Sequence, residues 1–467
     1  MSDSGDMTAG VRTLLGDPKA AIRALAWPMM VAMALQTLYN LADTIWVAGL
    51  GADALAAVGF VFPFFFAVFG LANGLGVGAG SAISRRIGRK DKAGADQVAV
   101  HTMVLLVAVS VVITIAGVLG APYMSVLTGP GPVAEMTTQY AQVIFYGTIF
   151  MLFTAIVTAM LRSEGDAKRA MYVMVASSLV NIVLDPVFIY VLGMGVAGAA
   201  WATIVSFIVA VVPMVWWLFI RQDTYVSVPF SGFRFQPTVI REILSVGLPA
   251  AFMQMSMAAT TVCLNVIIML VATTDGVAIY STGWRVVMIA ITPLIAITTA
   301  VVSVSGAAYG ARDYLKMEIG HLYAIKLGFG IGCVIAVLTF IFAPQIALIF
   351  TFSEGAAHLY DELVFFIRVI CIFYPTTALG MFSSGLFQGT GKGLNALIVT
   401  LLRTIVLTVT VSFGLAVVAG WGLHGVWWGL VIGNVIGSLV AFTWARLYTK
   451  NLKKTGPGPD ASPSGSA

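Results

Sequence analysis

The sequence predicts an all-α integral membrane protein, with twelve transmembrane helices in two six-helix bundles. Three observations predict this class. Of the 467 residues, 59% are hydrophobic and only 10% are charged, whereas a soluble domain is nearer half apolar and a quarter charged. Apolar runs long enough to cross a bilayer recur along the whole chain, and Lys and Arg gather in alternate connections between them. No polar segment is long enough to bury a core of its own.

The apolar runs define the predicted helices, because a membrane span needs about 20 mostly apolar residues. Several runs are longer, so we expect tilted, kinked or extended helices. The first helix is expected to stay uncleaved, since no small-residue cleavage site follows a short apolar segment. The predicted spans are residues 21–49, 54–84, 95–121, 133–161, 170–192, 196–220, 241–272, 276–309, 317–343, 358–387, 394–419 and 423–449.

The distribution of Lys and Arg provides a test of the predicted number of spans. These basic residues occur in the connections at 85–92, 162–169, 221–241 and 312–316, at Lys392, and beside both termini, while the intervening connections carry none. The positive-inside rule therefore predicts a multi-pass plasma-membrane protein with both termini cytoplasmic. The net charge of +5 lies mostly in these loops, which favours membrane lipids as partners and argues against nucleic acid.

The chain also repeats itself. "IGRKDKAGA" (87–95) matches "YGARDYLKM" (309–317), and "GMGVAGAAWAT" (193–203) matches "GWGLHGVWWGL" (420–430). Each copy holds an even number of helices, so we expect two bundles related by a pseudo-two-fold axis along the membrane normal, with a site between them. The predicted parts are a cytoplasmic segment 1–20, an N-lobe 21–222, a cytoplasmic linker 223–240, a C-lobe 241–450 and a disordered cytoplasmic tail 451–467.

Two aspartates lie inside predicted spans, Asp43 in "LYNLADTIWVAG" (38–49) and Asp185 in "SLVNIVLDPVFIY" (178–190). A charge there costs roughly 2.5–3.5 kcal/mol on insertion scales, which makes such acids candidates for function. Helical spacing places further polar side chains on the faces of these two acids and on the sixth helix. These side chains are Gln36, Tyr39, Asn40, Ser177, Ser178, Asn181, Thr203 and Ser206.

If these faces converge, they form an oxygen-rich pocket in the N-lobe. Two carboxylates in it cannot both stay charged without a compensating cation, so the pocket binds either a proton or a hard cation such as Na⁺. The alternative is that the aspartates are structural and hydrogen-bond neighbouring helices. Aligning the repeats places Leu264 opposite Asp43 and Ser412 near the counterpart of Asp185. The acids were therefore not duplicated, which favours a functional role.

Other features receive narrower interpretations. Pro28 is a candidate bending point of the first helix. Met253 and Met257 are candidates for an adaptable lining of the substrate cavity. The other candidates for this cavity are Gln36, Asn40, Ser177 and Ser206. Arg285 and Arg403 are candidates to line a cavity. The three cysteines lie in apolar runs and the four histidines lack ligand spacing, so no disulfide framework, metal framework or cofactor is expected.

The stretches "WPMMVAMALQTLYNLADTIWVAGLG", "NIVLDPVFIY" and "GVAGAAWAT" resemble the multidrug and toxic compound extrusion (MATE) family, in its DinF-like branch. The resemblance covers roughly residues 20–450. It implies an antiporter in which two bundles rock about a central cavity. It also implies an N-lobe H⁺ or Na⁺ site at Asp43, Asn181, Asp185 and Thr203, with Tyr39 beside it and bending of the first helix near Pro28.

The sequence therefore predicts a secondary active exporter of small organic compounds rather than an enzyme. Since one chain contains both lobes, we expect it to function as a monomer. A lipid-linked precursor flippase of the same superfamily is the first alternative. A channel or an intramembrane enzyme is a more remote one, because Asp43 and Asp185 are the only acid pair available to such an enzyme.

Overall fold

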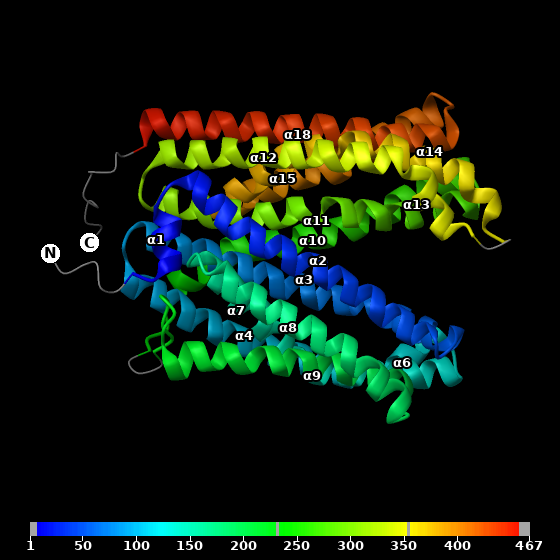
Figure 1. Ribbon diagram of the computed structural model, residues 1–467, viewed down its shortest axis with the longest axis horizontal. Coiled ribbons are helices and arrows are strands. Elements are labelled where there is room, and N and C mark those ends of the chain that lie inside the picture. The colour runs from blue at the N-terminus through cyan, green and yellow to red at the C-terminus, as the bar shows by residue number, and fades with distance from the viewer. Residues whose placement is uncertain (1–6, 230–232, 353–354, 457–467) are drawn as a thin grey trace. The chain divides into compact units, whose positions relative to one another are not determined.

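The computed structural model describes residues 7–229, 233–352 and 355–456 (Figure 1). In these ranges the chain is helical and contains no strand. Within the described ranges, eleven helices are long and apolar enough to cross a membrane, and the bent pair α6–α7 makes a twelfth span when it is counted as one. The predicted all-α membrane fold is therefore confirmed.

The chain divides into two compact units. Unit 1 contains Ala24–Ala251 together with α1, and unit 2 contains Asp17–Arg23 and the chain from Phe252 onward. The helices of the first half are α1 (Ala9–Leu15), α2 (Pro18–Ala48), α3 (Ala52–Gly88), α4 (Lys92–Gly120), η1 (Ala121–Met124), α5 (Ser125–Thr128), α6 (Pro132–Tyr146), α7 (Thr148–Ser163), α8 (Ala167–Pro186), η2 (Val187–Val191), α9 (Gly195–Val215) and η3 (Trp216–Arg221).

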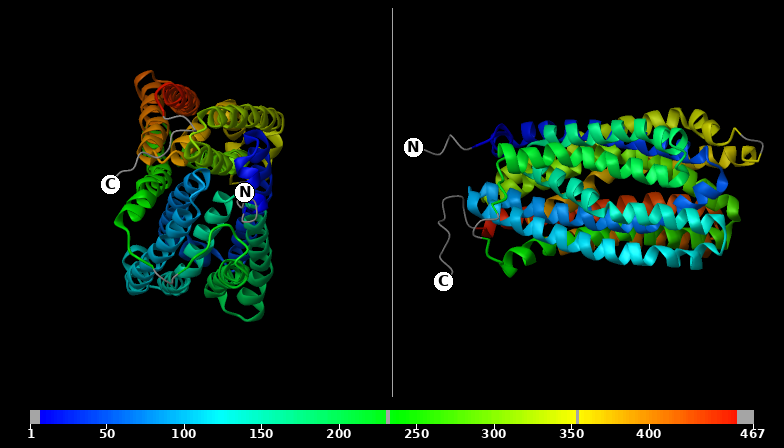
Figure 2. Two further views of the ribbon diagram at one scale, coloured as in Figure 1. Left: turned by 90° about the vertical axis from the view of Figure 1, so that its left-hand side faces the viewer. Right: turned by 90° about the horizontal axis from the view of Figure 1, so that it is seen from below.

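The second half continues with α10 (Pro237–Val271), α11 (Thr274–Gly310), α12 (Tyr314–Ile341), α13 (Ala343–Phe350), η4 (Ala357–Leu359), α14 (Tyr360–Ile370), η5 (Cys371–Phe373), α15 (Tyr374–Gly389), α16 (Gly393–Leu401), η6 (Leu402–Leu407), α17 (Thr408–Phe413), η7 (Gly414–Val418) and α18 (Gly422–Thr455). Within each unit the long helices run side by side (Figure 2).

The boundary between the units does not follow the predicted linker 223–240. It falls between Ala251 and Phe252, inside the continuous helix α10, so the first half of α10 packs in unit 1. Pro249 lies two residues before this boundary. In the equivalent helix α2, Asp17–Arg23 belongs to unit 2, and Pro28 follows closely after the chain enters unit 1 at Ala24.

Small residues set the close helix contacts of unit 1. A methyl group added at Gly76 of α3 would lie 2.9 Å from the Ala159 Cβ of α7. At Gly147, where α6 and α7 meet at 49°, an added methyl would overlap the Ile204 side chain of α9. Glycine therefore allows α9 to approach the bend. The bend also explains why one predicted span, 133–161, forms two helices.

In unit 2, glycines likewise allow close helix contacts along α18. Four glycines spaced four apart face the preceding span, and at Gly425 an added methyl would lie 2.6 Å from the Ala416 nitrogen. In unit 1, Gly198 of α9 makes the equivalent approach to the backbone of Phe188. Both glycines occupy the same position in the aligned repeat, so the duplication seen in the sequence preserves a backbone contact.

The tail prediction needs one correction. Residues 451–455 were predicted to be disordered, but α18 continues through them to Thr455. Ion pairs explain the extension, since Glu318 of α12 binds both Arg446 and Lys453 of α18 at 2.5 Å. Residues 457–467 of the predicted tail and residues 1–6 of the predicted N-terminal segment lie outside the described residues.

Candidate functional site: a cluster of buried acceptor oxygens in unit 1

Asp185 and Asn181 are the centre of the candidate site. They lie one turn apart on α8 and are 0% and 1% exposed. Both carboxylate oxygens of Asp185 and the side-chain oxygen of Asn181 are buried without a hydrogen-bond partner. The Asn181 amide donates to the Thr203 hydroxyl of α9 at 3.4 Å, and that hydroxyl donates to the Ala199 carbonyl. Buried acceptors in folded proteins nearly always have partners, so three unpaired acceptors together mark a candidate site for a water, a proton or a cation.

Helix α2 brings the second acid to this site. Asp43 interacts electrostatically with Asp185, and the Tyr39 side chain interacts with both carboxylates. Asp43 is only partly buried. Tyr140 of α6 interacts with the same three groups. Tyr140 did not stand out in the sequence, because its span contains no acid at helical spacing from it and only Thr137 lies one turn away.

Local backbone features hold this arrangement. Pro186 follows Asp185 and has no N–H, and the helix widens immediately after it into the π-turn η2. At the end of this turn the Tyr190 hydroxyl donates to the Trp46 carbonyl of α2 at 2.5 Å, and the two rings pack edge to face. The contact ties the end of α8 to α2 close to Asp43.

The remaining predicted site residues are distributed unevenly. Ser177 and Ser206 are buried in unit 1, but the Ser206 hydroxyl donates to the Thr203 carbonyl, which makes it part of the helix backbone network. Gln36 is partly buried and Asn40 is exposed. Met253 and Met257 belong to unit 2, where the Met253 sulfur accepts from the Thr400 hydroxyl at 3.2 Å. The role of these methionines in a substrate cavity stays a prediction.

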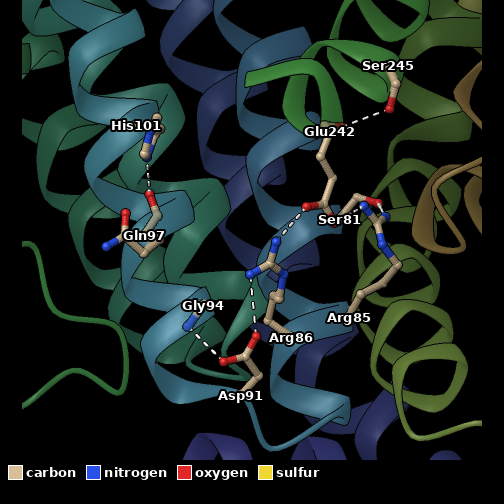
Figure 3. Close-up of polar contacts among 9 residues, drawn as sticks. All are labelled: Ser81, Arg85, Arg86, Asp91, Gly94, Gln97, His101, Glu242 and Ser245. Carbon is tan, nitrogen blue, oxygen red and sulfur yellow. Dashed lines mark hydrogen bonds and ion pairs between the residues drawn. The ribbon is translucent and has the colours of Figure 1, made fainter. Parts of the chain in front are cut away.

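A second polar cluster of unit 1 is a set of ion pairs at the C-terminal end of α3. The Glu242 carboxylate of α10 contacts Arg85 and Arg86, each at 2.9 Å (Figure 3). Arg85 also donates to the Ser81 hydroxyl, and Arg86 reaches Asp91 at 3.4 Å. We call this set the Glu242 bridge. The backbones are close here, since a methyl at Gly78 would overlap the Ile243 carbonyl oxygen.

Side chains of α4 and of the residue after α7 accept hydrogen bonds from the backbone of the segment between η3 and α10. Glu164, which is 2% exposed, accepts from the Val226 N–H at 2.9 Å. Asp96 accepts from the Ser227 N–H at 2.8 Å, and the His101 Nε2 accepts from the Gln236 N–H at 2.8 Å. Burial raises the pKa of Glu164 to about 8, against the opposing effects of the Val226 N–H and of Arg169 and Lys92.

The chemistry available at the oxygen cluster is cation binding. Asp43, Asn181, Asp185 and Thr203 supply carboxylate, amide and hydroxyl oxygens, the ligand types that suit a hard cation. The same carboxylates can instead accept protons. Among the described residues no group of three or more His, Cys, Asp or Glu side chains could hold a metal ion, so a Na⁺ ion would depend on the neutral oxygens as well.

Comparisons with known proteins agree on one family. The MatE family model matches the chain over residues 28–187 and 249–413. The multidrug export protein MepA of Staphylococcus saprophyticus is 27% identical over 437 residues, which cover 91% of this chain and 93% of that protein. MepA of Staphylococcus aureus is 26% identical over 450 residues, 92% of this chain and 94% of that protein. A solved outward-facing structure of a multidrug resistance MATE transporter of the MOP superfamily aligns with a TM-score of 0.93 at 44% identity, covering 96% of this chain and 100% of that one.

Proposed function

Because this chain belongs to the MATE family, we propose that it is a secondary active multidrug exporter, which moves organic compounds out of the cell in exchange for inward H⁺ or Na⁺. The relatives named as export proteins and transporters support export rather than catalysis. The twelve-span architecture supports a multi-pass protein of the plasma membrane, and the alternation of basic loops supports cytoplasmic termini.

The buried acceptor oxygens of Asp185 and Asn181 are the observation that carries the proposal. With both acids ionised, the unit 1 site attracts a cation or a proton. Its entry neutralises the charge that holds a cationic substrate, and alternating access then couples the two movements. A proton moving through 100 mV supplies roughly 2.3 kcal/mol. Each pH unit of gradient adds about 1.36 kcal/mol.

Transport in proteoliposomes tests the proposal. Vesicles containing the wild type, loaded with a fluorescent organic cation, should release it under an inward pH or Na⁺ gradient, and the effective gradient identifies the coupling ion. Asp43→Asn and Asp185→Asn should abolish the gradient-driven part. Asp53→Asn is the matched control, because Asp53 is an exposed acid in the first turn of α3. Wild-type rates in both site variants would contradict coupling at these acids.

A further inference from the structure

Unit 2 contains a partly buried cation that the proposed coupling does not use. Arg403 lies in the π-turn η6, inside the span Gly393–Val418. At 1.5 Å per residue it is about 15 Å from the start of that span, which is mid-membrane depth. Its Nη1 atom is buried and has no hydrogen-bond partner. At this depth the side chain cannot reach the bilayer surface by extending along its own helix.

Glycines on two neighbouring helices make room for this side chain. A methyl group at Gly380 of α15 would lie 2.9 Å from Nη1, and one at Gly437 of α18 would lie 2.7 Å from the Arg403 Cα. The Thr408 hydroxyl donates to the Arg403 carbonyl at 2.7 Å, over the five-residue spacing of a π-turn. The Arg403 side chain therefore passes between α18, which contacts its stem, and α15, which contacts its guanidinium.

No acid in the described part of unit 2 pairs with Arg403. The acids there lie near the first residues of helices, and they are Asp17, Asp275, Asp313, Glu318, Asp361 and Glu362. The ion pairs of Glu318, Glu362 and Asp275 are made with other residues. The Gly380 methyl position is also 2.8 Å from the neutral Ser438 hydroxyl oxygen.

An unpaired charge in this position is costly, and intramembrane charges usually mark a substrate or ion pathway. The loops before the two spans align Gly165 with Gly391, which places Ser177 opposite Arg403 in the repeat. The cation, like the two aspartates, is therefore absent from the other copy and is not required by the shared scaffold. A group that neutralises it must come from outside the described residues of this unit.

We propose that Arg403 binds the anionic group, a carboxylate or a phosphate, of a transported compound. A guanidinium presents planar paired donors that match both groups. Mid-membrane depth argues against a lipid headgroup in its resting position, because headgroups lie at the bilayer surface. This inference rests on the proposed export function for the source of the ligand.

Equilibrium binding to the full-length protein in uncharged detergent tests it. Rhodamine B carries a free carboxylate and its ethyl ester does not, so the pair isolates the anionic group. Arg403→Gln should weaken rhodamine B binding by about 10- to 100-fold, the range of a hydrogen bond to a charged group. It should leave the ester unchanged. Arg403→Lys should retain part of the difference, and Arg368→Gln, which changes an exposed arginine of α14, should affect neither dye.

Displacing the guanidinium gives an independent variant that keeps its charge. Gly380→Ala should weaken rhodamine B selectively, whereas Gly414→Ala, where an added methyl meets nothing within 4 Å, should not. If Arg403→Gln fails to fold, the comparison of Gly380→Ala with Gly414→Ala still tests the proposal. Equal wild-type affinity for both dyes, no binding of the acid, or equal losses for both dyes would overturn the inference. No gradient is used, so a failure of coupled transport leaves these results standing.

Discussion

The Glu242 bridge allows the effect of one substitution to be estimated closely. Glu242→Gln removes the carboxylate that neutralises Arg85, whose side chain is 6% exposed, and Arg86, whose side chain is 18% exposed. Losing one partner of a buried ion pair costs about 3–5 kcal/mol. Since the Glu242 side chain is 24% exposed and glutamine keeps an acceptor oxygen, we expect unit 1 to lose about 2–3 kcal/mol of unfolding free energy.

Glu318→Gln is the matched control, because Glu318 also bridges two cations, Arg446 and Lys453, but both of these side chains are 38% exposed. Exposed pairs contribute about 0–1 kcal/mol. Denaturant unfolding of each variant in the same mixed micelles, followed by tryptophan fluorescence, measures both losses. If Glu242→Gln costs no more than Glu318→Gln, then burial of the Glu242 bridge does not stabilise unit 1 as argued.

Two further substitutions test the packing around this bridge and the segment between η3 and α10. Gly78→Ala should cost about 1–3 kcal/mol by overpacking against Ile243, while Gly59→Ala, at an open position, should cost little in the same unfolding assay; equal costs would contradict the close contact. Burial raises the pKa of Glu164 to about 8 from an ordinary 4.5, so the folded state holds a proton that the unfolded state releases. The unfolding free energy should therefore fall as pH rises from about 5 to 8, by up to about 4 kcal/mol. Glu164→Gln should remove this dependence of the unfolding midpoint on pH. If the dependence persists in this variant, another titrating group causes it.

Local sequence patterns were sufficient to predict the membrane class and the number of spans. They were also sufficient to single out Asp43 and Asp185 as candidate functional residues. Apolar runs of fixed length, alternating basic loops and a charge inside a span are short-range features, and the bilayer imposes them on each segment separately. The spacing of Asn181 and Asp185 on one helix face is equally local. Helix bounds were less accurate where a single glycine, Gly147, permits a bend, because the bend depends on a neighbouring helix.

Tertiary structure alone decided which polar groups share an environment. Tyr140 joins the acids only because α6 packs beside α9, and Glu242 meets Arg85 only because the first half of α10 packs in unit 1. The sequence marked Arg403 only as a candidate to line a cavity, and the surrounding helices reveal that no acid in the described part of its unit pairs with it. The sequence by itself determined which segments enter the membrane, since that depends on each segment's own apolar length. Packing between distant segments determined which charges are paired and which remain to bind something else.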